Sequence, residues 1–108
     1  MKYTYAAEKF STARSALMLP HPMGEAEPIM RAFHECSLAL HNLDKENLDD
    51  YALTRVARLE ELMSTEGLKD PSGKGLWIVK AERLTIDEKI ELARIVDELA
   101  YWFDRKSS

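Results

Sequence analysis

The chain has 108 residues, the size of one domain, and a chain of this length can bury a core without metal or disulfide support. Its content of 45% hydrophobic and 31% charged residues is that of a globular domain and unlike that of a disordered one. The net charge of −4 argues against a general affinity for nucleic-acid phosphates.

Cysteine usage and hydropathy bear on the compartment. The single cysteine, Cys36, cannot form an intramolecular disulfide, which favours a reducing environment. No apolar run approaches the length of about 18 residues that a membrane span needs, and the first residues lack the apolar centre of a signal peptide. We therefore expect a cytoplasmic protein that does not associate with membranes.

Two helices are predicted in the first half of the chain. Apolar residues at spacings of three and four predict a first helix from Tyr3 to about Leu19, where Pro20 and Pro22 end it. A second helix is expected from about Glu25, because Pro28 is tolerated in a first helical turn.

The third and last predicted helices have the clearest patterns. The third extends from Leu48 to Met63, and Gly67 suits its C-terminal cap region. The last begins at Thr85, because Thr85 and Glu88 have the spacing of a capping box. Its apolar residues cover about half of the helix circumference, and a band that wide usually contacts two neighbouring elements. They are Leu92, Ile95, Val96, Leu99, Trp102 and Phe103.

Between these helices, residues 66–84 form a long arm in which the helical period is lost. Residues 70–75 are rich in turn formers, and Trp77–Val79 have strand propensity that could pair with residues 2–5 in a two-stranded ribbon. An ordered arm or a short helix is the favoured alternative. The predicted fold class is all-α: one domain over residues 1–108, a four-helix bundle with this arm between helices three and four.

No stretch of the sequence predicts catalysis. Residues 67–75 resemble a phosphate-binding loop, but five residues separate the first two glycines instead of four, and no strand precedes the loop, so we interpret it as a turn. The acidic pairs lie on polar helix faces and are interpreted as solvated charges. We expect a protein that is not an enzyme and uses no cofactor.

His34, Cys36 and His41 lie on one predicted helix. His34 and His41 are two turns apart, about 10 Å along the helix, so both cannot bind one metal ion directly. Cys36 is interpreted as a small hydrophobic residue near the core. No metal site is predicted.

The aromatic cluster near the C-terminus is the feature most typical of a protein-binding surface, because Trp and Tyr dominate interface anchors. Simple core packing is the favoured interpretation of this cluster, and an interface, including self-association, is the alternative. The partner-binding hypothesis assigns five residues and leads us to expect a homodimer or a complex with another protein. These residues are Trp77, Leu99, Tyr101, Trp102 and Phe103.

A second hypothesis is a small regulator associated with nucleic acid. It uses a moderately basic set on helix three and the arm, with Trp77 available for base stacking. The set is Arg55, Arg58, Lys69, Lys74, Lys80 and Arg83.

Overall fold

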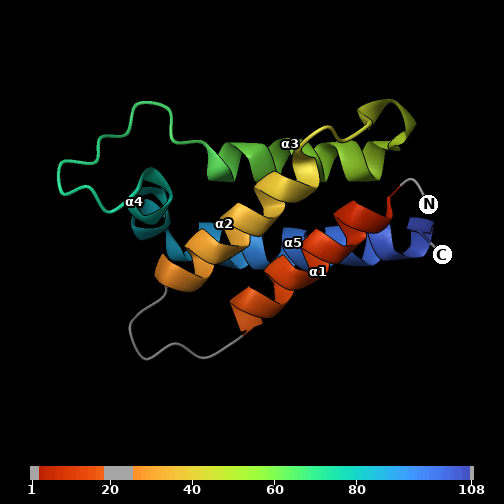
Figure 1. Ribbon diagram of the computed structural model, residues 1–108, viewed down its shortest axis with the longest axis horizontal. Helices are drawn as coiled ribbons and strands as arrows, with labels where there is room; N and C mark the ends of the chain where they lie inside the picture. Colours follow the sequence, from red (N-terminus) through yellow and green to blue (C-terminus); the bar gives the residue numbers. More distant parts are fainter. Residues whose placement is uncertain (1–2, 19–25, 108) are drawn as a thin grey trace.

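The first two helices pack against each other. The structure, a computed structural model, describes residues 3–18 and 26–107 (Figure 1). Helix α1 spans Thr4–Met18 and helix α2 spans Ala26–Leu40, so both predicted helices are confirmed within these ranges. Pro20, Pro22 and the expected start of the second helix at Glu25 lie outside the described residues.

A short 3₁₀ helix, η1 (Lys45–Asn47), leads from α2 to α3 (Asp50–Met63). The side chain of Asp49 caps α3, accepting a hydrogen bond of 2.9 Å from the backbone N–H of Ala52. The helix ends at Met63, because Ser64 takes an extended backbone conformation. The prediction that Gly67 caps this helix is therefore wrong, and Gly67 lies in a following turn with φ of 78°.

Helix α4 (Leu76–Arg83) follows the turns at residues 64–75. Trp77–Val79 belong to this helix and Thr4–Tyr5 to α1, so the predicted ribbon is wrong, and its alternative, a short helix, is confirmed. The helix buries Ala81 in its last turn and Leu84 directly after it, while α4 packs on α2. Burial on a neighbouring helix outweighs the weak strand propensity of these residues.

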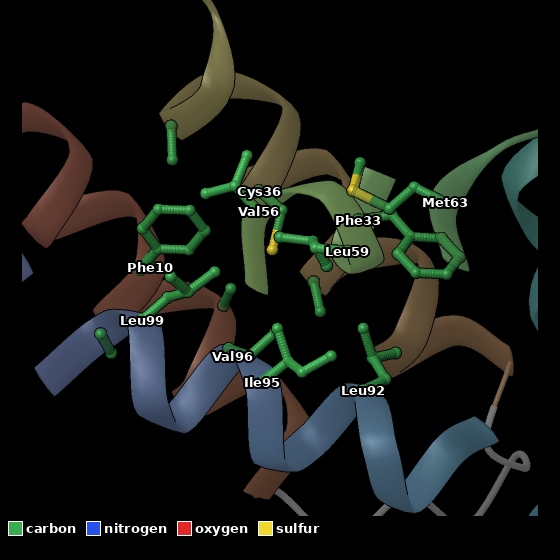
Figure 2. Packing of buried hydrophobic residues seen from close by; sticks show 14 of the residues in the cluster. Phe10, Phe33, Cys36, Val56, Leu59, Met63, Leu92, Ile95, Val96 and Leu99 are labelled. Atoms are coloured by element: carbon green, nitrogen blue, oxygen red, sulfur yellow. The ribbon is translucent and has the colours of Figure 1, made fainter. Parts of the chain in front are cut away.

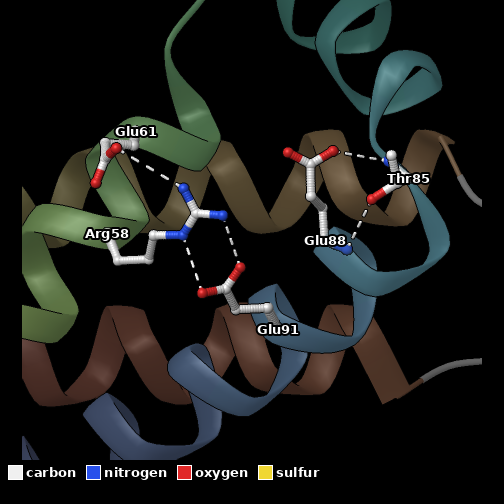
Figure 3. Close-up of polar contacts among 5 residues, drawn as sticks. All are labelled: Arg58, Glu61, Thr85, Glu88 and Glu91. Carbon is white, nitrogen blue, oxygen red and sulfur yellow. Dashed lines mark hydrogen bonds and ion pairs between the residues drawn. The ribbon is translucent and has the colours of Figure 1, made fainter.

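The last helix, α5 (Ile86–Ser107), begins at the predicted capping box. The backbone N–H of Glu88 donates to the Thr85 hydroxyl at 3.1 Å, and the backbone N–H of Thr85 donates to the Glu88 carboxylate at 2.8 Å (Figure 3). Both interactions satisfy backbone groups that a helix N-terminus leaves free.

The described residues form an all-α fold, as the sequence predicts. Helix α1 packs against α2 and α5, α3 packs against α5, and α4 packs against α2. Figure 1 shows α4 nearly end-on, crosswise to α3 and α5, so the four longer helices form a bundle-like arrangement with a fifth across one end. One cluster of buried side chains joins all five helices, and Figure 2 shows part of it.

Helices α1 and α5 run in opposite directions. The Tyr3 and Phe103 rings are 5.2 Å apart at one end of the pair, and Arg14 forms an ion pair of 3.5 Å with Asp97 further along. Met18 lies one turn beyond Arg14, toward the beginning of α5. This arrangement fixes which face of α5 is covered.

Candidate functional site

The inner face of α5 is fully occupied by the core. Figure 2 shows four α5 side chains that point toward α2 and α3, and none of them is more than 3% exposed. They are Leu92, Ile95, Val96 and Leu99. Phe103 continues this face and stacks on Phe10 with a ring-centroid distance of 5.2 Å. The wide apolar band of the sequence is therefore accounted for by the packing of α1 and α3 on α5, in agreement with the expectation of two neighbouring elements.

The opposite face of α5 carries exposed apolar side chains. At about 100° per residue, five exposed positions fall within roughly 60° of one another on the side away from the core. They are Ile86, Ile90, Asp97, Tyr101 and Asp104, and we call them the outer stripe. Ile86 is 75% exposed, Ile90 62% and Tyr101 61%. Three of the large apolar side chains that the described residues expose thus lie on one helix face.

The borders of the outer stripe are defined by α1 and α3. On the α1 side, Arg14 pairs with Asp97, and Met18, which is 75% exposed, lies toward the isoleucine end. On the α3 side, Arg94 lines a groove of about 350 Å³ together with Glu91 and Glu98. The stripe therefore places three large apolar side chains beside the carboxylates of Asp97 and Asp104, with arginines at its borders.

Most of the predicted partner-binding residues do not lie on this surface. Leu99 and Phe103 are fully buried, so neither is exposed to a partner. Trp102 is half-buried and donates through its Nε1 to Asp49 at 3.3 Å. Of the residues predicted on α5, Tyr101 alone belongs to the outer stripe.

Trp77 lies away from the outer stripe, on α4. Its ring meets that of His34 edge-on at 6.4 Å and borders an open groove of about 370 Å³ between α2 and α3. The structure therefore does not bring Trp77 together with Tyr101. Ile86 and Ile90 are not among the residues that the sequence pattern predicts for partner binding. The signal that could have identified them is their position around the helix axis, which is opposite to that of Leu92 and Leu99.

A shallow hollow of about 430 Å³ lies at the far end of the stripe, between the start of α3 and the end of α5. Its aromatic rings carry stacked cations: Arg105 lies 5.5 Å from the Tyr101 ring, and Lys106 lies 5.4 Å from the Trp102 ring. The hydrogen bond from Ala52 and the one from Trp102 lower the pKa of Asp49, which also lines the hollow. The cations, the aromatic rings and the Asp49 carboxylate of this hollow already interact with one another. The hollow therefore lies next to the outer stripe but indicates no particular ligand.

Three of the six residues of the basic set are paired with carboxylates. The Arg58 guanidinium forms a bidentate ion pair with Glu91, donating from Nε at 2.9 Å and from Nη2 at 2.8 Å (Figure 3). Its Nη1 lies 3.8 Å from the carboxylate of Glu61. Arg55 donates to Glu98 at 3.1 Å. The guanidinium of Arg58 lowers the pKa of Glu91, which keeps that carboxylate ionised.

The rest of the basic set lies elsewhere. Lys74 pairs with Glu82 at 2.8 Å, while Lys69 lies in the arm and Lys80 and Arg83 lie on α4. Arg55 and Arg58 line the α3–α5 groove instead. Arg58 and Lys80 both lie close enough to Glu88 to interact with its charge, and three of the six cations pair with an adjacent carboxylate.

The loop that resembles a phosphate site binds its own carboxylate. Asp70 accepts hydrogen bonds from the backbone N–H of Lys74 at 3.0 Å and from that of Gly75 at 2.6 Å. Gly75 has φ of 104°, a conformation that favours glycine. The amides that would face a phosphate are occupied by Asp70, in agreement with the interpretation of this loop as a turn.

The residues considered for thiol or metal chemistry are not arranged for it. Cys36 is fully buried, and burial together with the nearby charge of Glu35 raises the pKa of its thiol to about 12. The interpretation of Cys36 as a core residue is confirmed. His34 and His41 are both exposed, and among residues 3–18 and 26–107 no group of three ligating side chains could hold a metal ion.

No family model, curated protein or solved structure matches this chain. Within the part of the chain that the structure describes, none of the helices combines the length and the apolar character needed to cross a bilayer. The candidate site therefore rests on geometry alone.

Proposed function

We propose that this chain is a non-enzymatic interaction or regulatory protein of the cytoplasm, and that the outer stripe of α5 is its binding surface. The single observation that carries the proposal is the exposure of Ile86 and Ile90 on one face of a helix whose other face is fully packed. The partner is another protein or a second copy of the chain.

The energetic argument concerns apolar area. Burying an isoleucine side chain that was fully exposed contributes roughly 1.5–3 kcal/mol. Ile86 and Ile90 lie one turn apart on the same helix face and retain most of that area. A partner that covers both gains two favourable contacts in one place, whereas an isolated exposed apolar residue has no such significance.

The non-enzymatic part of the proposal is supported by how the reactive groups are used. The Cys36 thiol is held protonated in the core, and Glu91 and Glu98 are bound to arginines. The amides of the glycine-rich loop bind Asp70. No specific observation favours the nucleic-acid hypothesis, which stays a prediction.

The experiment is a quantitative capture from native cell extract with the tagged chain. Wild type is compared with the double variant Ile86→Glu/Ile90→Glu and with a control, Leu53→Glu, which places one glutamate at an exposed apolar position on α3. Circular dichroism establishes that all three chains are folded. Proteins retained by wild type and the control but lost by the double variant support the proposal. Equal retention by all three chains refutes it.

A further inference from the structure

The segment between α3 and α5 is held to the other helices by few side chains. None of residues 64–80 is buried, in contrast to Met63 before them and Ala81 after them, which are 8% and 1% exposed. Within its span, α4 buries Ala81 alone, whereas each of the four longer helices buries at least four side chains. Segments with so few buried contacts open at a lower free energy than the core of the same protein.

The polar interactions of this segment join it mainly to itself. Lys74 pairs with Glu82 at 2.8 Å, and the Asp70 carboxylate accepts hydrogen bonds from two backbone N–H groups of its own loop. The two partners of the ion pair are 46% and 47% exposed, and ion pairs at such positions contribute little to stability. Lys80 also interacts with Glu88 of α5 through its charge. None of these interactions joins α4 to α2.

Helix α4 depends on its contact with α2. It has eight residues, and helices this short are not stable alone in water. Its N-cap residue, Gly75, has no side chain that could accept a hydrogen bond from the first helical turn. Detachment of α4 from α2 and unwinding of α4 therefore occur together.

Trp77 closes the groove between α2 and the end of α3. Its indole meets the His34 ring edge-on at 6.4 Å and borders the groove of about 370 Å³ together with Leu40 and Met63. Figure 2 shows Met63 beside Phe33, which is fully buried. Removal of Trp77 from the groove therefore opens this edge of the core to solvent, beginning with Met63.

We propose that residues 64–80 form a strap that detaches and unwinds while α1, α2, α3 and α5 remain folded, and that the strap thereby controls access to the α2–α3 groove. Ala81 and Leu84, both buried, anchor the end of the strap next to the capping box of α5. The occupant of the groove is this strap of the same chain, so the closed and open states expose different surfaces. The inference does not depend on the outer stripe.

Native-state hydrogen exchange of the full chain, followed by mass spectrometry in low concentrations of urea, tests the opening. Amides of α4 are expected to exchange at least roughly tenfold faster than amides in the middle of α5, with little dependence on urea, because opening of the strap exposes little surface. Trp77→Ala should accelerate exchange in α4 by roughly tenfold or more. Leu76→Ala, which truncates a side chain of the same helix that is 41% exposed, should change it little. A common rate and a common urea dependence for α4 and α5 overturn the inference.

A core variant separates opening of the strap from global unfolding. Leu99→Ala removes contacts that the open state retains, so exchange in α5 should accelerate by roughly thirtyfold or more while exchange in α4 stays unchanged. If Leu99→Ala does not fold, Ile95→Val makes the same comparison with an expected acceleration of roughly threefold. Equal acceleration in α4 and α5 would mean that α4 opens only when the whole chain unfolds, and it would overturn the inference.

Thiol labelling of Met63→Cys in the folded chain tests which surface the strap covers. The introduced thiol is expected to react faster than the buried Cys36 of the same molecule, and faster still when Trp77→Ala is added. Peptide mapping by mass spectrometry distinguishes the two thiols. Labelling at position 63 that is as slow as that of Cys36, or that Trp77→Ala leaves unchanged, would mean that the strap does not control access to the groove.

Discussion

The assignment of inner and outer faces to α5 can be tested by replacing two aromatic residues two positions apart. Phe103 is fully buried between Phe10 and Tyr3, with both ring-centroid distances at 5.2 Å. Phe103→Ala removes these contacts and leaves a cavity, for which large-to-small core replacements typically cost about 3–5 kcal/mol. Tyr101 is 61% exposed and contacts Arg105 through its ring, so Tyr101→Ala is expected to cost no more than about 1 kcal/mol.

The assay is urea unfolding followed by circular dichroism, at protein concentrations where wild type is monomeric, so that dimer formation does not contribute. A small domain has only about 5–15 kcal/mol of total stability, so Phe103→Ala is expected to lower the unfolding midpoint strongly. Equal midpoints for Phe103→Ala and Tyr101→Ala, or a larger loss for Tyr101→Ala, would mean that α5 is rotated from the orientation described.

Four further outcomes are expected. Thr85→Ala removes the hydroxyl that caps α5 and should lower the free energy of unfolding in urea by about 1 kcal/mol. Thr85→Ser keeps the hydroxyl and should keep most of the wild-type stability, so equal stability of the two variants would contradict the capping role. Because Arg58 lowers the pKa of Glu91, the unfolded chain binds more protons, so the free energy of unfolding should fall as pH drops through the ordinary value of 4.5 and below. Glu91→Gln should have a flatter acid profile, and an unchanged profile would contradict the pairing. Cys36 should resist thiol reagents in the native chain and react once denatured, whereas rapid native labelling would contradict its burial. Because half of the basic set is paired, no salt-sensitive shift of DNA or RNA probes is expected at low salt, and a shift with a steep salt dependence would support the nucleic-acid hypothesis instead.

The helices were predictable because their signals are local. The capping box at Thr85 and the apolar period of α3 depend on residues within a few positions of one another, and both appear as expected. The ribbon was wrong because Trp77–Val79 were judged by strand propensity, while packing of α4 against α2 decides their conformation. That contact joins distant parts of the chain and leaves no local pattern.

The candidate site was predicted less well, since exposure depends on which neighbours cover a helix. The partner-binding hypothesis includes Leu99 and Phe103 because they belong to the aromatic end of this helix, but α1 and α3 both pack on α5 and these two side chains are fully buried. The pairing of Arg58 with Glu91 spans 33 positions and could not be read from the sequence. Tyr101 was identified from its residue type, whereas Ile86 and Ile90 required the phase of the helix.

The most direct test of the outer stripe is side-chain footprinting of the chain at high dilution in purified form and again in concentrated native extract. Covering of the stripe by any protein, including a second copy, should protect Ile86, Ile90 and Tyr101 from labelling in the extract. Tyr5 and Leu53, exposed on α1 and α3, should label equally in both conditions. Equal labelling of the stripe in both conditions would contradict the claim that this face of α5 is a binding surface.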